Sequence, residues 1–187
     1  MGRPNPVAGV PIYSFMSAIV FWLFGRSAAG KTTLASALIR NLRAGGRPVL
    51  ELDGDQMRAG LSSDLGFSAE ARSENHRRLA EVARLVSDQG VMVVVASMAP
   101  LAAHRAIVDA ILGARLRWVH VDASLETCIE RDPKQLYRRA KSGGVSLLLE
   151  FPFECPELDA RMLHLTTDVE TVEQTSCRLI DWARSQL

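Results

Sequence analysis

Gly25-Arg26-Ser27-Ala28-Ala29-Gly30-Lys31-Thr32 fits the pattern G-x-x-x-x-G-K-[ST] of a phosphate-binding P-loop. The apolar run 18–24 before it predicts a buried strand, and the pattern over 33–42 after it predicts a helix. Because strand, loop and helix follow in the order that such a loop requires, the match is far more specific than the pattern alone. A glycine-containing turn beside a chance lysine is the alternative that this context disfavours.

The loop residues predict a binding site for a nucleoside triphosphate with Mg²⁺. Glycines let the backbone bend until several N–H groups point at one phosphate chain, and the following helix N-terminus adds partial positive charge. Lys31 can reach the β- and γ-phosphates, and the Thr32 hydroxyl is a suitable Mg²⁺ ligand. The predicted nucleotide-binding residues of this loop are Gly25, Ser27, Ala28, Ala29, Gly30, Lys31, Thr32 and Thr33.

Length and composition indicate a globular protein of one domain spanning 1–187. The chain has 187 residues, 48% of them hydrophobic and 23% charged, and a net charge of +1. Such a balance provides no basic field for nucleic acid or a membrane surface, so we expect neither as a partner. The apolar run 12–24 is interrupted by serines and is shorter than the roughly 20 residues of a membrane span. We interpret 1–17 as a loosely held arm.

Three cysteines, Cys128, Cys155 and Cys177, match neither a zinc pattern nor a disulfide framework. We therefore expect inert or buried thiols and a cytoplasmic protein.

Strand-like and helix-like segments alternate along the chain. After the loop, strands are predicted at 47–53, 91–96, 116–121 and 162–165, and helices at 68–89, 101–112, 124–131, 134–142 and 169–185. This alternation predicts an α/β fold with a parallel sheet and helices on both faces. Ligands of such sheets bind at the carboxyl ends of the strands, where the P-loop, Asp53, Asp55, residues 97–100 and Asp122 are expected.

Two carboxylates follow the second predicted strand. Asp53 and Asp55 beside a P-loop can hold Mg²⁺ or take a proton from an attacking hydroxyl, although an Asp-Gly turn and a helix N-cap explain the same residues. We favour the functional interpretation. Arg72, Asn75 and Arg78 recur at helical spacing and predict one polar face that could bind an anion, with a solvated face as the alternative.

Longer stretches of the chain resemble the adenylyl-sulfate (APS) kinases, P-loop enzymes that phosphorylate the 3′-hydroxyl of APS with Mg-ATP. The resemblance runs from about residue 21 to the C-terminus. Its motifs are Trp22, Gly30-Lys31-Thr32-Thr33, Leu52-Asp53-Gly54-Asp55, Arg58-Ala59-Gly60-Leu61, Asp64-Leu65-Gly66-Phe67, Arg72-Ser73-Glu74-Asn75-His76-Arg77-Arg78 and Arg131-Asp132-Pro133-Lys134.

The resemblance implies roles at the matching positions. Lys31 and Thr32 would bind the ATP phosphates and Mg²⁺, Asp55 would orient or deprotonate the acceptor hydroxyl, and Asp53 would support the metal. The residues implied to contact the substrate are Arg58, Phe67, Arg72, Asn75, Met98, Ala99, Arg105 and Lys134. Within that set, Phe67 would stack on the adenine. Arg131 would bind the nucleotide from a mobile lid over about 132–156. His76 and His104 match no catalytic position, and we expect them to be solvated.

The chain departs from the family pattern in three places. Arg26 and Ala28 replace a leucine and a glycine of the loop, and Ala99 replaces a serine after the third strand. The lid lacks the family's Gly-Phe-Thr-Gly-Ile-Asp, with Leu148 and Phe151 as possible substitutes for the second stacking aromatic, and Gln135 stands where the family has glycine. A phosphoserine at position 99 is excluded because alanine has no hydroxyl.

Three functions remain open at this point. The first is an APS kinase making 3′-phosphoadenylyl sulfate. The second is a kinase of the same fold that acts on another nucleotide conjugate through its altered lid. The third is a nucleotide-binding domain without catalysis, which the retained Lys31, Thr32 and Asp55 disfavour. The resemblance further implies ATP and Mg²⁺ as cofactors and a homodimer.

Overall fold

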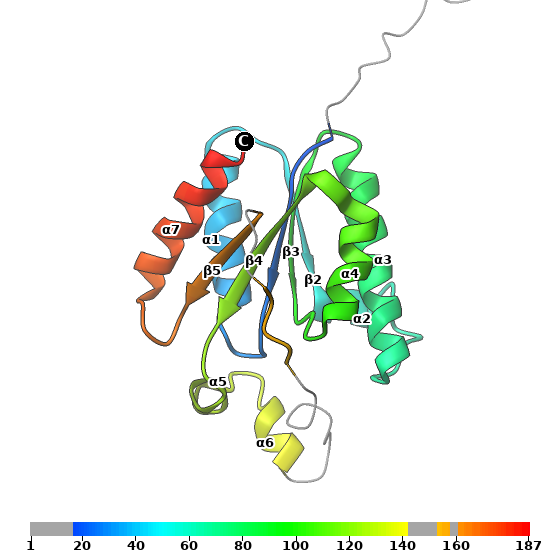
Figure 1. Cartoon of the computed structure of the whole chain (residues 1–187), viewed down its shortest axis with the longest axis vertical. Coiled ribbons are helices and arrows are strands. Elements are labelled where there is room, and N and C mark those ends of the chain that lie inside the picture. The colour runs from blue at the N-terminus through cyan, green and yellow to red at the C-terminus, as the bar shows by residue number, and fades with distance from the viewer. Residues whose placement is uncertain (1–16, 142–152, 158–160) are drawn as a thin grey trace, which may run out of the picture.

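One parallel five-stranded sheet organises the protein (Figure 1). The computed structural model describes residues 17–141, 153–157 and 161–187, so residues 1–16 of the predicted arm 1–17 and residues 142–152 of the predicted lid lie outside them. The strands are β1 (Val20–Phe24), β2 (Val49–Asp53), β3 (Met92–Ser97), β4 (Leu116–Asp122) and β5 (Met162–Thr166), in the spatial order β2-β3-β1-β4-β5. All neighbouring pairs are parallel, which confirms the predicted α/β fold.

Helices cover both faces of this sheet (Figure 1). α1 (Lys31–Ala44) and α7 (Val172–Ser185) lie on one face, and α3 (Ala69–Ser87) and α4 (Ala102–Leu112) lie on the other. Short helices follow β2 and β4: α2 (Gly54–Ala59), α5 (Leu125–Arg131) and α6 (Leu136–Lys141). A 3₁₀ turn over Gly113–Arg115 connects α4 to β4.

The central strand β1 contributes to two separate cores. Phe21 and Leu23 point to the face covered by α1 and α7, whereas Val20, Trp22 and Phe24 point to the face covered by α3 and α4. Every residue of β1 is fully buried, as expected for a central parallel strand covered on both faces. The P-loop therefore begins at the end of the most firmly packed strand of the sheet.

Local signals predicted most elements to within two or three residues. Ser68 caps α3 and Ser124 caps α5 through their side-chain oxygens, and Gly90 follows the end of α3 with a φ of 75°. Helix α2 was not predicted as an element, although an Asp-Gly turn followed by an aspartate N-cap, Asp55, was the alternative considered there. The N-cap is instead Asp53, the aspartate of the expected turn, because its carboxylate accepts hydrogen bonds from the backbone N–H groups of Asp55 and Gln56.

The expectation that His76 and His104 are solvated is wrong. Their exposed fractions are 4% and 0%, and their rings stack with centroids 4.7 Å apart where α3 packs against α4. Burial lowers the pKa of His76 to about 3 and that of His104 to about 4. The ring of Trp22 in β1 also stacks on His76, with 6.4 Å between the ring centroids. The pair is thus a neutral part of the core.

The three cysteines differ in burial. Cys128 is a buried free thiol, whereas Cys155 and Cys177 are exposed free thiols, so only Cys128 is buried as expected.

Among the helices that the structure describes, none combines the length and the apolar character needed to cross a bilayer.

The buried histidine pair predicts a loss of stability in acid. His104 has a pKa of about 4 in the native state, below the ordinary histidine pKa of 6.5, so the unfolded chain binds a proton that the native protein excludes. The stabilisation that the neutral His104 ring provides is complete above pH 6.5 and is lost as the pH falls toward 4. Between pH 7 and 4.5, the free energy of unfolding of wild type should therefore fall by roughly 2 kcal/mol more than that of His104→Leu, because the variant has no imidazole at this position. Urea titrations at both pH values measure this, and an equal fall in both proteins would contradict it.

Candidate active site

A pocket of about 1050 Å³ opens at the carboxyl ends of the strands. It brings together residues from the P-loop, from the segment after β2, from α3 and from the lid. The predicted site residues that line it are Ser27, Ala28, Gly30, Lys31, Thr32, Thr33, Asp53, Asp55, Arg58, Phe67, Arg72, Asn75, Met98, Arg131 and Lys134. Gly25, Ala29, Ala99 and Arg105 were also predicted, and they lie behind this surface rather than on it.

The backbone of the P-loop explains its glycines. Gly25 has a φ of 154°, and a Cβ at this position would lie 2.0 Å from the carbonyl oxygen of Val121 on the neighbouring strand β4. Gly30 has a φ of 99° and is the N-cap of α1, where left-handed backbone favours glycine. Ala28 adopts a φ of 65°, which is left-handed without the freedom of glycine.

Lys31 lies over the P-loop and donates from Nζ to the carbonyl oxygens of Gly25 at 3.1 Å and Arg26 at 2.6 Å. Burial is the main cause that lowers its pKa from 10.5 to about 8, and the charges of Cys128 and Asp55 offset this only in part. Among the described residues this buried ammonium donates to neutral carbonyls alone and is poorly compensated, so an anion in the pocket would be stabilised beside it.

Two residues that sequence analysis missed hold the P-loop from outside. The Tyr137 hydroxyl of α6 donates to the Ser27 carbonyl at 3.1 Å, and the Thr167 hydroxyl after β5 donates to the Ala29 carbonyl at 2.8 Å. Arg131 donates to the hydroxyl and to the carbonyl of Thr167. The position of Thr167 directly after the last strand was the only available signal for its role.

Asp53 and Asp55 line the same pocket, and their charges act on Lys31. Asp53 Oδ1 accepts the backbone N–H of Asp55 at 2.8 Å, and Asp55 pairs with Lys134 Nζ at 2.5 Å. This ion pair raises the pKa of Lys134. The side chains of Asp55 and Lys134 are 67% and 53% exposed, and exposed pairs contribute only about 0–1 kcal/mol. A ligand can therefore separate them at little cost.

Phe67 lies between two guanidinium groups at the rim of the pocket. Arg58 lies 4.8 Å and Arg72 5.7 Å from its ring centroid, and both also donate to backbone carbonyls of this turn, those of Gly66 and Phe67. Burial lowers the pKa of both arginines, and the charge of Arg58 adds to the effect at Arg72. Two partly desolvated cations beside a half-exposed aromatic ring form a suitable surface for an anionic aromatic ligand.

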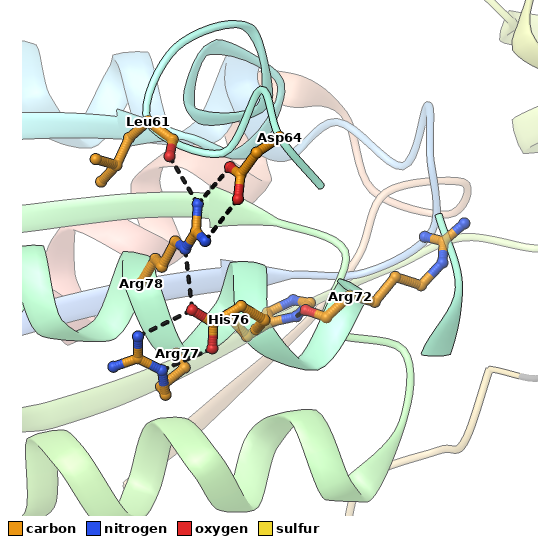
Figure 2. Close-up of polar contacts among 7 residues, drawn as sticks. Leu61, Asp64, Arg72, His76, Arg77 and Arg78 are labelled. Atoms are coloured by element: carbon orange, nitrogen blue, oxygen red, sulfur yellow. Dashed lines mark hydrogen bonds and ion pairs between the residues drawn. The ribbon is translucent and has the colours of Figure 1, made fainter. Parts of the chain in front are cut away.

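The predicted polar face of α3 divides into two parts. Asn75 is 3% exposed, lines the pocket, and its Oδ1 has no hydrogen-bond partner among the described residues. Arg78 faces away from the pocket and binds both carboxylate oxygens of Asp64 at 2.6 and 2.8 Å as well as the Leu61 carbonyl (Figure 2). Asn75 thus offers an acceptor to a ligand, whereas Arg78 holds the segment before α3 in place.

The loop after β3 borders the pocket and is hydrogen-bonded to the P-loop. Met98 lines the pocket, and its carbonyl accepts the Gly25 N–H at 3.2 Å. Arg105 is 8% exposed and donates to the carbonyls of Ala99 and Pro100 at 3.1 and 3.3 Å, so it positions this loop. Ala99 is fully buried with a φ of 39°.

The described end of the predicted lid, residues 153–156, contacts the same loop. Glu154 donates its backbone N–H to the Pro100 carbonyl at 2.9 Å, and the Phe153 ring stacks on His120 at 5.6 Å. Arg26 lies 5.0 Å from the centroid of Phe153. Leu148 and Phe151, the possible substitutes for the second aromatic, lie outside the described residues.

Comparisons with known proteins agree with this geometry. The family model described as adenylylsulphate kinase matches residues 17–161. The adenylyl-sulfate kinase of Bacillus licheniformis is 39% identical over 170 residues, which are 89% of this chain and 85% of that protein. That of Paraburkholderia xenovorans is 42% identical over 163 residues, covering 86% of this chain and 90% of that protein.

A solved structure is similar over most of its length. The APS kinase CysC of Mycobacterium tuberculosis, in complex with AMPPNP and APS, superimposes with a TM-score of 0.82 at 36% identity. The match covers 90% of this chain and 98% of that one. The sheet order, the P-loop and these matches together show that the chain belongs to the adenylyl-sulfate kinase family.

Proposed function

We propose that the protein is an ATP-dependent kinase that phosphorylates the 3′-hydroxyl of APS to give 3′-phosphoadenylyl sulfate. The observation that carries this proposal is that Lys31 of the P-loop lines the same pocket as Asp55, Arg58 and Arg72. Family membership supports the same reaction. A triphosphate on the P-loop would then present its γ-phosphate toward a second nucleotide held across the pocket.

The Thr32 hydroxyl and the Asp53 carboxylate line the pocket and are oxygen ligands of the kind that Mg²⁺ prefers. They fit the ion, which would offset negative charge on the ATP phosphates. Lys31 and the backbone N–H groups of the P-loop would bind the same phosphates and stabilise the charge that develops during in-line transfer. The phosphoryl group would thus be held without any covalent intermediate on the protein.

Asp55 is the proposed proton acceptor for the 3′-hydroxyl. For that, its ion pair with Lys134 must open, which leaves Lys134 available to the transferring phosphate. Arg58 and Arg72 would bind the phosphosulfate, and Phe67 would stack on the adenine. The Oδ1 of buried Asn75, which has no hydrogen-bond partner within residues 17–141, 153–157 and 161–187, would accept a hydrogen bond from the substrate. Each of these groups lines the pocket together with the P-loop.

The larger organisation is also a proposal. We infer a single kinase domain in which residues 132–156 form the lid, with α6 holding it to the P-loop through Tyr137. A cytoplasmic homodimer is the expected state of the protein. A solved APS kinase from Thiobacillus denitrificans is described as hexameric, so sedimentation analysis is the direct measurement of assembly.

Turnover with APS tests the proposal directly. We expect release of ADP from Mg-ATP to depend on APS, with little release when the acceptor is absent. Release that requires another nucleotide conjugate and not APS would favour the alternative acceptor implied by the altered lid. Nucleotide binding without release for any acceptor would indicate a non-catalytic domain.

Lys31 predicts a pH dependence of nucleotide binding. In the free protein its pKa is about 8, and a bound triphosphate would raise it, so binding should take up a proton near pH 8.5 and weaken as the pH rises above 8. Calorimetry in buffers of different ionisation enthalpy measures this uptake. Lys31→Arg keeps its charge over this range and should bind with little pH dependence, whereas Lys31→Ala should lose turnover by at least about 100-fold. Equal pH profiles for wild type and Lys31→Arg would refute the assignment.

Asp55 predicts a loss of rate without a loss of nucleotide binding. Asp55→Asn removes the proton acceptor, so kcat should fall by about 10²–10⁴-fold while the Kd for ATP changes little. Asp181→Asn is a matched control, because this carboxylate is 77% exposed on α7 and does not line the pocket, and its kcat should equal that of wild type. If Asp55→Asn weakened ATP binding and left kcat intact, Asp55 would be a ligand of the metal or nucleotide instead.

A further inference from the structure

Three metal-ligating side chains gather on β4 and β5, outside the pocket described above. His120 and His164 are direct partners in the parallel register of these strands, so their side chains lie side by side on one face of the sheet. Asp122 lies two residues beyond His120 and therefore on the same face. The nitrogen and oxygen ligand atoms of the three residues all lie within 4.8 Å of one another.

His120 is the buried member of this cluster, with an exposed fraction of 1%. Its ring packs against Phe24, at 4.9 Å and 19°, and against Phe153, at 5.6 Å and 13°, and these two phenylalanine rings also contact each other at 6.5 Å. Neither ring nitrogen has a hydrogen-bond partner among the residues that the structure describes. Leaving a buried polar atom without a hydrogen-bond partner costs about 1–3 kcal/mol of stability. His120 holds two such atoms at a position where an apolar side chain would avoid this cost. This arrangement indicates a ligand for the imidazole.

Asp122 and His164 form the open side of the cluster. The Nε2 atom of His164 lies 3.4 Å from Oδ2 of Asp122, and the side chains are 36% and 38% exposed, respectively. That distance is close to the separation of two ligand atoms on one tetrahedral ion with bonds of about 2.0–2.1 Å. The half-exposed side chains can move by the roughly 1 Å needed to bring all three ligand atoms within such bonds.

We propose that His120, Asp122 and His164 bind a divalent transition-metal ion, with Zn²⁺ as the best match. Two imidazoles and one carboxylate are typical ligands of Zn²⁺, and Mg²⁺ is disfavoured because it prefers oxygen ligands. Three protein ligands leave one coordination position, which the exposed side of the cluster opens to water. The site is independent of the proposed kinase reaction, since none of its residues lines the nucleotide pocket.

The ion would act as a structural link at the base of the lid. It joins the edge strand β5 to β4, and it fixes the His120 ring on which Phe153 stacks. Phe153 is the first described residue after 142–152, and Glu154 beside it is hydrogen-bonded to the loop after β3. Metal binding therefore stabilises the position where the lid rejoins the sheet.

Metal-free, nucleotide-free protein tests the site with Zn²⁺ and Co²⁺ alone. Calorimetry should show one Zn²⁺ per chain, and Co²⁺ should develop the visible d–d absorption of a site with imidazole ligands. His164→Gln and Asp122→Asn change half-exposed side chains and keep His120 in place, so both variants should fold. Each should weaken Zn²⁺ binding by at least about tenfold and abolish the rise in unfolding midpoint that Zn²⁺ causes in wild type.

Thiols are the competing ligands, so Cys155→Ser and Cys177→Ser are the matched controls and should bind Zn²⁺ like wild type. The proposal is overturned if wild type binds no stoichiometric Zn²⁺. It is equally overturned if His164→Gln and Asp122→Asn both bind as wild type does, or if binding is lost with a cysteine variant. None of these results depends on ATP or APS, so failure here leaves the kinase proposal intact.

Discussion

The structure depends on the hydrogen bonds that the carbonyl groups of the P-loop accept. A loop that turns its N–H groups inward toward a phosphate chain must turn carbonyl oxygens outward, and each of these needs a donor. Lys31 supplies donors to the carbonyls of Gly25 and Arg26, Tyr137 to that of Ser27, and Thr167 to that of Ala29. Elements far apart in the sequence are thereby tied to one loop, which fixes where α6 and the segment after β5 lie.

Charge in the pocket is arranged for a ligand that is negative at both ends. Lys31 at the P-loop and the pair Arg58 and Arg72 beside Phe67 are all partly desolvated, and burial lowers the pKa of each. In the same pocket, Asp55 has a removable counterion, Lys134, from the segment between α5 and α6. The cations are thus poorly solvated before a ligand arrives, which favours anions strongly over neutral molecules of the same shape.

Sequence reasoning predicted what local patterns encode. The strand-loop-helix order around Gly25–Lys31, the buried strands and the caps at Ser68 and Ser124 depend on neighbouring residues, and the fold followed from them. Contacts between distant segments were not predictable. Tyr137 reaches Ser27 across 110 residues, and the burial of His104 depends on how α3 packs against α4. No spacing within either segment indicates such a partner.

Ala28 has a further consequence. It holds a left-handed φ of 65° in place of the glycine usual in this family, a conformation that costs an alanine about 1–2 kcal/mol and that the free chain rarely adopts. Its neighbours Ser27 and Ala29 are bound by Tyr137 and Thr167, which take their places only once α6 and the end of β5 have docked. The left-handed backbone of the phosphate-binding loop is therefore held by contacts from distant segments of the chain and not by the loop's own residues.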